Sequence, residues 1–118
     1  MEQNHPLVSI SLLTYNAERY IENCLVSVLK QTYPHLEILV VDNASTDGTK
    51  DYLKKFQNLR KATPKTKIPE LRVIFNQKNV GFAAGHNQAI KQSKGEFILC
   101  LNQNIIIIIF SHFHFKFT

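Results

Sequence analysis

Apolar and polar positions divide the chain into seven short segments with two kinds of spacing. Four nearly continuous apolar runs, each bounded by turn-forming residues, predict β-strands over 8–13, 36–41, 71–75 and 97–101. Between them, apolar residues recur three and four positions apart, which predicts helices over 17–30, 48–56 and 82–92. Strict alternation of strand and helix is typical of an α/β fold with a mostly parallel sheet and helices on its faces.

Residues at the ends of the predicted helices favour these boundaries. Asn16 is placed to cap the first helix, and Glu18 would favour its first turn. Asp47 is placed to cap the second helix, and Gly48 would relax the turn before it. Residues 58–70 contain two prolines and several lysines without a period, so we expect an exposed loop there.

Side chains at helical spacing predict the inner faces of the first two helices. Tyr20, Tyr52 and Phe56 belong to those faces, and we assign them to the core. Cys24 and Cys100 lie far apart in apolar surroundings, which predicts two buried thiols in a reducing compartment. The predicted localisation is therefore cytoplasmic.

Charge changes this picture in one region. Seven of the fourteen Lys and Arg residues fall between positions 50 and 67, with only Asp51 against them. A solvated helix face explains most of this, and attraction to an anionic partner or a membrane surface is the alternative. We expect no nucleic-acid partner, since no helix-turn-helix, zinc-finger or RNA-binding signature accompanies the charge.

No apolar run reaches the roughly 18 residues of a membrane-spanning helix, and the amino terminus lacks the pattern of a signal peptide.

Three polar segments follow predicted strands directly, at 14–16, 42–49 and 102–104. Ligands of open parallel sheets bind beyond the carboxyl ends of the strands, so these segments form the candidate site. Amide, carboxylate and tyrosine side chains can pair with a base edge or lie against its face, and helix N-termini can face phosphates. The residues alone predict an α/β ligand-binding domain.

Two longer stretches carry a family resemblance. They read VSISLLTYNAERYIENCLVSVLKQTYPHLEILVVDNASTDGT and NVGFAAGHNQAIKQSKGEFILCLN. In order and spacing they resemble the family 2 glycosyltransferases, inverting enzymes of the GT-A (Rossmann-like) fold, and their rhamnosyltransferase-like branch above all. The resemblance spans about residues 6–104 and implies a partial domain of about four strands and three helices. It also implies a nucleotide-sugar-binding domain over 1–104, incomplete relative to the family, followed by a patternless apolar tail over 105–118.

The resemblance implies donor-binding roles for matching residues. Thr14, Tyr15 and Asn16 would line the nucleoside pocket, although Leu13 replaces the proline usual in the family. Asp42 and Asn43 match the positions that read the base or hold the ribose.

In the second stretch, Gly81 and Gly85 would allow close backbone approach near the donor, with loop geometry alone as the alternative. Asn87 matches a donor-binding Asn, and His86 replaces an Arg that often precedes it. His86 could touch a phosphate, but a surface or capping role is the simpler expectation.

The end of the matching region departs from the family. Relatives hold Mg²⁺ or Mn²⁺ with an aspartate after the fourth strand, where this chain has Asn104. An amide can coordinate a metal but carries no charge, so we expect a weak or absent metal site. Asp and Glu are absent after Glu96, and the general base of the family is therefore not expected here. The change at residue 104 predicts a truncated or frame-shifted end.

The functional hypothesis is the donor-binding half of an inverting glycosyltransferase that acts with UDP- or dTDP-linked sugars in cell-surface polysaccharide biosynthesis, with the acceptor unspecified. The alternatives are a nucleotide-sugar-binding module without turnover and a non-functional, aggregation-prone gene fragment. A receiver-like or dinucleotide-binding domain is disfavoured, because neither an acidic pair nor G-x-G-x-x-G follows the first strand. Peripheral attachment at the inner face of the membrane is compatible with each.

Overall fold

A computed structural model describes residues 5–62 and 69–102 of the 118-residue chain as one sheet with three helices. The strands are β1 (Val8–Thr14), β2 (Leu36–Asp42), β3 (Glu70–Phe75) and β4 (Phe97–Asn102), and the helices are α1 (Ile21–Leu29), α2 (Thr49–Lys61) and α3 (Phe82–Gln92). The sheet order is β3-β2-β1-β4, and all three pairings are parallel. This is the predicted α/β fold, with each strand within one residue of its expected ends.

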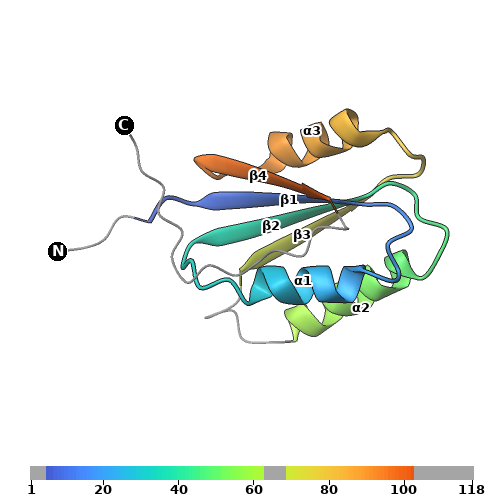
Figure 1. The fold of residues 1–118 in the computed structure, drawn as a ribbon, viewed down its shortest axis with the longest axis horizontal. Coiled ribbons are helices and arrows are strands. Elements are labelled where there is room, and N and C mark those ends of the chain that lie inside the picture. The colour runs from blue at the N-terminus through green and yellow to red at the C-terminus, as the bar shows by residue number, and fades with distance from the viewer. Residues whose placement is uncertain (1–4, 63–68, 103–118) are drawn as a thin grey trace.

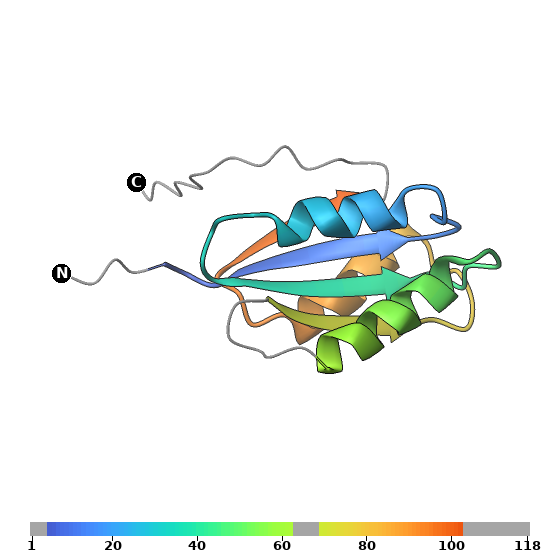
Figure 2. The same cartoon turned by 90° about the horizontal axis from the view of Figure 1, so that it is seen from below.

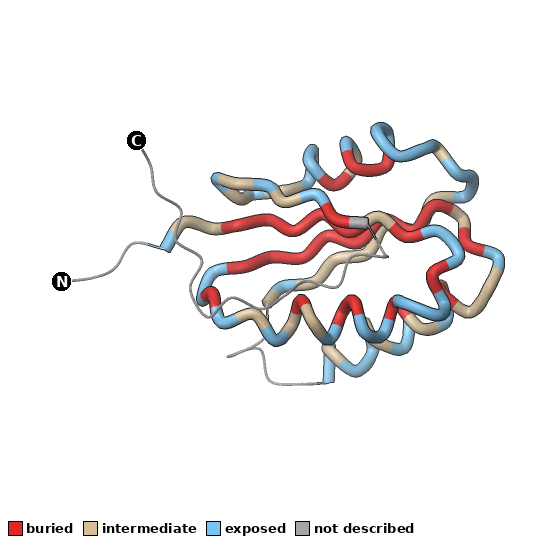
Figure 3. Tube along the Cα trace, viewed as in Figure 1, coloured by how far each residue is buried: buried red, intermediate tan, exposed pale blue. Residues whose placement is uncertain are grey.

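The sheet lies between two helical layers (Figures 1 and 2). Helices α1 and α2 cover one face, and α3 covers the other, where it packs on β1 and β2. Strand β2 is buried along its whole length, as its mostly apolar sequence predicts for a central strand covered on both faces. The burial map of Figure 3 accordingly concentrates its buried segments on β1 and β2, with the outer turns of the helices exposed.

The main core fills the space between the sheet and helices α1 and α2. Its fully buried side chains are Leu12, Ile21, Leu25, Val28, Ile38, Val40 and Leu53. Full burial of one such aliphatic side chain stabilises a fold by about 1.5–3 kcal/mol, so this layer supplies most of the hydrophobic driving force. A smaller apolar cluster under α3 consists of Leu39, Val41 and Ala89.

The first two helices differ from their predicted bounds. Helix α1 begins at Ile21 rather than residue 17, because Asn16 adopts a left-handed backbone (φ 48°) and residues 17–20 form turns. Asn16 is therefore not its cap, and Glu22 rather than Glu18 lies in its first turn. Helix α2 continues to Lys61, so the expected loop begins later than residue 58.

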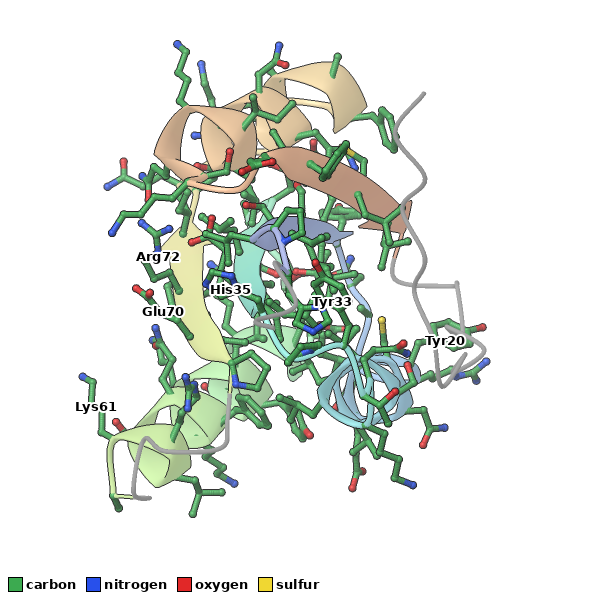
Figure 4. All side chains as sticks on the ribbon, turned by 90° about the vertical axis from the view of Figure 1, so that its left-hand side faces the viewer. Tyr20, Tyr33, His35, Lys61, Glu70 and Arg72 are labelled. Atoms are coloured by element: carbon green, nitrogen blue, oxygen red, sulfur yellow. The ribbon has the colours of Figure 1, made fainter. Side chains whose placement is uncertain are left out.

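Two side chains predicted to be buried, Tyr20 and Cys100, are exposed, whereas Tyr52 and Phe56 pack against the core as predicted. Tyr20 precedes α1 and is 47% exposed, and Figure 4 shows it on the outer side of that helix. Cys24 is buried as predicted, whereas Cys100 on the edge strand β4 is exposed, since α3 packs mainly on β1 and β2. The prediction failed for Tyr20 and Cys100 because spacing does not reveal where a covering layer ends.

Candidate functional site

The carboxyl ends of the strands are level with one another. In the pairing register, Thr14 of β1 lies beside Asp42 of β2, and Asp42 lies beside Phe75 of β3. Asn102 ends β4 beside Leu13. The loops that follow β1, β2 and β3 consequently gather at one end of the molecule (Figure 1), as expected for the candidate site.

The loops after β1 and β2 are joined by a series of hydrogen bonds. The Oδ1 atom of Asn16 accepts the backbone N–H groups of Thr46 (2.7 Å) and Asp47 (3.3 Å). The backbone N–H of Asn16 donates to Ser45 Oγ (2.9 Å), and that of Ala17 donates to Thr49 Oγ1 (2.8 Å). The two loops therefore form one pre-organised platform at the carboxyl edge.

Backbone strain marks the same platform. Asn16 has φ 48° and Ala44 has φ 62°, the two positive values at non-glycine residues in the described chain. Asn tolerates this conformation, but for Ala it costs roughly 1–2 kcal/mol. Strain of this kind persists where surrounding contacts impose it and is concentrated at binding sites.

The Asp42 carboxylate is committed to internal partners. Its Oδ1 atom accepts hydrogen bonds from Thr14 Oγ1 (2.8 Å) and Ser45 Oγ (2.6 Å), and its Oδ2 atom accepts the backbone N–H of Ser45 (3.0 Å). Thr14 and Asp42 are fully buried. Both residues thus shape the platform from beneath, and their side chains do not reach its surface.

Asn43 belongs to a chain of amides across three elements. Its Oδ1 atom accepts from Asn76 Nδ2 (3.0 Å) and the backbone N–H of Val80 (3.4 Å), and its Nδ2 group donates to the Gly81 carbonyl (3.1 Å). Asn76 in turn pairs with Gln88 of α3 through two hydrogen bonds of 2.7 and 2.9 Å. Asn43 is only 2% exposed, so its amide fixes the loop before α3 from inside.

The two glycines of this region serve different purposes. Gly81 precedes α3 with φ 89°, a conformation that other residues rarely adopt. Gly85 allows close packing, because a Cβ there would lie 2.5 Å from Leu13 Cδ1 and 3.3 Å from Asn43 Nδ2. Gly48, by contrast, has an ordinary φ of −76°, and a Cβ there would meet the Glu18 carboxylate.

His86 lies inside the fold. It lies on the buried side of α3, and its Nδ1 atom is 2.7 Å from Ser11 Oγ on β1. Burial lowers the pKa of His86 below its ordinary value. The expected surface or capping role is therefore wrong, and Asn87, the next residue, is exposed instead.

Sequence comparison identifies the family to which these features belong. The family model "Glycosyl transferase family 2" matches residues 9–104. This chain belongs to glycosyl transferase family 2. It spans about a third of the length of the curated relatives it matches.

Named relatives of this family 2 chain include enzymes and structures with bound donors. The Escherichia coli UDP-Glc:α-D-GlcNAc-diphosphoundecaprenol β-1,3-glucosyltransferase WfgD is 36% identical over 102 residues, which cover 86% of this chain and 36% of WfgD. Staphylococcus aureus TarS (residues 1–349) in complex with UDP-GlcNAc is 34% identical with a TM-score of 0.69, over 83% of this chain and 26% of that one. The Pyrobaculum calidifontis mannosyltransferase PcManGT in complex with GDP-Man and Mn²⁺ is 28% identical with a TM-score of 0.74, over 86% and 28%.

In this family 2 chain, a single weak metal ligand, Asn104, was predicted after β4, in a site expected to be weak or absent. Asn104 and the tail over 105–118 lie outside the described residues. Within residues 5–62 and 69–102, no group of three or more His, Cys, Asp or Glu side chains could hold a metal ion. The described residues therefore do not by themselves fit the divalent cation that accompanies GDP-Man in PcManGT.

Asp47 is the remaining carboxylate of the platform. It accepts the backbone N–H and hydroxyl of Thr49 (3.0 and 2.6 Å) and the backbone N–H of Glu18 (3.1 Å). Burial would raise the pKa of Asp47, but these hydrogen bonds lower it overall. Asp47 thus satisfies a donor at the start of α2, as predicted, although Gly48 is the formal cap.

A second polar cluster, which was not predicted from the sequence, lies near the amino-terminal ends of the strands, opposite the candidate site. Glu37 on β2 is buried and accepts hydrogen bonds from Ser9 Oγ (2.5 Å), the backbone N–H of Lys94 (2.6 Å) and Arg72 on β3 (2.9 Å). Figure 4 shows Arg72 on β3, near Glu70. The available signal was Glu37 within an apolar strand and Ser9 at the matching position of β1.

Proposed function

We propose that this chain binds a nucleotide sugar on the platform at the carboxyl edge of its sheet. The part of the ligand that it holds is the nucleoside diphosphate, UDP or dTDP. The observation that carries the proposal is the pre-organised junction between the loops after β1 and β2, which borders a half-exposed tyrosine ring. The UDP-GlcNAc complex of TarS supports it, since that structure shares the fold.

Under this proposal, the predicted site residues fall into two groups. Tyr15 is 45% exposed and Asn16 and Asn87 are exposed, so these side chains face the ligand. Thr14, Asp42 and Asn43 act from beneath by holding the loops in place, and Gly81, which is exposed, accepts a hydrogen bond from Asn43 at its carbonyl. We accordingly propose residues 1–104 as the nucleotide-sugar-binding domain.

The reaction that we propose for the family 2 enzyme represented by this chain is a single displacement. It inverts the anomeric centre as the sugar is transferred to an acceptor hydroxyl. WfgD supports it, because that relative is a β-1,3-glucosyltransferase that uses UDP-Glc. The acceptor hydroxyl must lose a proton to a general base, here a carboxylate that is free to accept it. Asp42 is fully buried and Asp47 already accepts hydrogen bonds from Thr49 and Glu18, so neither suits that role.

These engaged carboxylates favour a second candidate, a binding module without turnover. A donor titration with product analysis separates the two, since an enzyme releases the nucleoside diphosphate from the sugar and a module returns the donor intact. We expect the donor to be returned intact by this chain alone. Measurable transfer or hydrolysis would contradict that expectation.

Calorimetric titration with UDP tests donor binding. Tyr15→Ala should weaken the affinity roughly tenfold, because stacking of a base on an aromatic ring contributes about 1–3 kcal/mol. Tyr20→Ala provides a matched control, since Tyr20 is exposed to the same degree but is the N-cap of α1 and takes no part in the side-chain hydrogen bonds that join the two loops. Equal losses in both variants, or no binding by the unmodified chain, would refute the assignment.

We also propose peripheral contact with an anionic membrane surface, through the outer face of α2. That face carries Lys55 and, one turn later, Leu59, which is 69% exposed. Lys61 is the last residue of α2, and Figure 4 shows it at the outer end of the helix. No helix among the described residues could cross a bilayer. Each Lys or Arg near an anionic surface contributes about 1 kcal/mol.

Co-sedimentation with vesicles tests this contact. Lys55→Glu with Lys61→Glu should release the chain from phosphatidylglycerol vesicles. Lys30→Glu, at the C-cap of α1, with Lys91→Glu on α3 makes the same charge change elsewhere. Equal release by both pairs would show that net charge alone, rather than α2, is responsible.

A further inference from the structure

Gln88 on α3 forms the far end of the amide chain that runs behind the candidate site. It is half-buried and faces Asn76, which directly follows β3. The two side chains form a reciprocal pair, in which Asn76 Nδ2 donates to Gln88 Oε1 (2.7 Å) and Gln88 Nε2 donates to Asn76 Oδ1 (2.9 Å). Gln88 is not one of the residues predicted to bind the donor, but through Asn76 it is connected to the loop that borders that site.

Backbone groups fix the direction of every amide in this chain. The Gly81 carbonyl accepts a hydrogen bond from Asn43 Nδ2 (3.1 Å), and the Val80 N–H donates to Asn43 Oδ1 (3.4 Å). Because Asn43 Oδ1 must face donors, Asn76 presents its Nδ2 group to it (3.0 Å) and keeps its Oδ1 atom for Gln88 Nε2. Gln88 therefore has one compatible orientation, in which its donor and its acceptor are both used.

The amide chain connects α3 to the carboxyl edge by a route other than the backbone. Asn76 is held at that edge, since its backbone N–H donates to the Asp42 carbonyl (2.9 Å). The loop over 77–81 returns to the edge at Gly81, which adopts a φ of 89°. Gln88 lies about two helical turns beyond Gly81, so its pairing with Asn76 determines how the start of α3 lies against the loop.

We infer that Gln88 is a positioning residue for the donor: through Asn76 and Asn43 it sets the place of the Val80–Gly81 backbone at the carboxyl edge. This inference rests on the proposed function and adds a residue that acts on the ligand through others. The role requires a donor and an acceptor side by side. An apolar side chain of the same length would leave Nδ2 and Oδ1 of Asn76 without these partners, and the loop would lose its fixed place.

Calorimetric titration of the full chain with UDP tests the inference by comparing Gln88→Met with Gln92→Met. Both substitutions replace a glutamine of α3 by an apolar side chain of similar length, but the side chain of Gln92 is exposed and outside the amide chain. We expect UDP affinity to fall roughly tenfold in Gln88→Met, the change expected for the net loss of about one to two hydrogen bonds, and to stay within about twofold in Gln92→Met. Unchanged affinity in Gln88→Met would overturn the inference and leave the proposed function intact. No binding by the unmodified chain would contradict both.

A second substitution, Gln88→Glu, separates positioning from a general loss of stability. A charged carboxylate cannot donate to Asn76 Oδ1, whereas a protonated carboxyl offers one donor and one acceptor, as the amide does. The contact with Asn76 Oδ1 disfavours the charged form and raises the pKa of the introduced carboxyl. UDP affinity relative to the unmodified chain should be reduced roughly tenfold at pH 7.5 and recover to within about threefold at pH 5.

Gln88→Met cannot regain the donor and should show the same relative loss of UDP affinity at both pH values. Recovery in Gln88→Glu alone is the result that a merely structural role would not produce. A loss in Gln88→Glu that does not change with pH, or equal recovery in both variants, would overturn the positioning role.

Discussion

The buried Glu37 cluster allows a sharp stability prediction through its partner Arg72. Arg72→Met keeps much of the aliphatic stem and removes the charge that donates to Glu37 at 2.9 Å and to the Gln92 carbonyl at 2.9 Å. Loss of one partner of a buried charge pair costs about 3–5 kcal/mol. The Arg72 side chain is 30% exposed, however, so water can replace part of the interaction, and we expect a loss of about 2 kcal/mol in the free energy of unfolding.

The same cluster determines a pH dependence. Burial would raise the pKa of Glu37, but hydrogen bonds from Ser9, Lys94 and Arg72 and the charge of Arg72 lower it overall below its ordinary 4.5. A lowered folded-state pKa means that the stabilisation is complete above the unfolded-state pKa and is lost as the pH falls through the folded-state value. Acidification below about pH 4.5 should therefore destabilise the native chain progressively, and Arg72→Met should flatten this dependence.

Urea unfolding monitored by circular dichroism at pH 7 and at pH 4 measures both effects. Lys55→Met is the matched control, since Lys55 is exposed on α2 and its loss should change stability by less than about 0.5 kcal/mol. Equal destabilisation by both substitutions, or an unaltered pH dependence in Arg72→Met, would refute the proposed role of the cluster.

Three further substitutions probe the platform and the end of β4. Ala44→Gly should leave the free energy of unfolding unchanged or raise it by up to about 1 kcal/mol, because relief of the positive φ offsets the flexibility of glycine. Ala84→Gly within α3 is the control and should lower the free energy of unfolding by about 1 kcal/mol. Thermal unfolding of both variants checks the sign. Gly85→Ala should cost about 1–3 kcal/mol, since its methyl group would overlap Leu13, and an unchanged melting temperature would contradict this packing. Asn104→Asp should increase the effect of Mn²⁺ on UDP affinity in calorimetry, because a carboxylate is a stronger ligand for a hard cation than an amide, and no increase would remove the predicted metal role of this position.

The sheet and its order of elements were predictable from sequence because each strand is a short apolar run closed by turn-forming residues. Helix α3 was predicted at its observed bounds, and turn-forming residues, Gly81 and Ser93, flank it. The start of α1 was not predictable locally. Asn16 leaves the helical region because the loop after β2, about thirty residues later, supplies donors to its side chain.

The candidate site was predictable in place but not in detail. Parallel strands bring their carboxyl ends to one edge, so the polar loops had to meet there. Whether a polar side chain at that edge faces the ligand or the interior depends on partners distant in sequence. Asn43 is turned inward by Asn76 and Val80, and His86 is buried against Ser11, 75 positions earlier.

Mapping the backbone amide resonances of the ¹⁵N-labelled chain during titration with UDP tests the donor platform most directly. The account predicts shifts concentrated at Tyr15, Asn16, residues 45–49 and residues 81–82, with the amide of Lys94 at the opposite edge unaffected. Shifts centred on Lys94 and the Glu37 cluster, or no shifts at millimolar UDP, would contradict it.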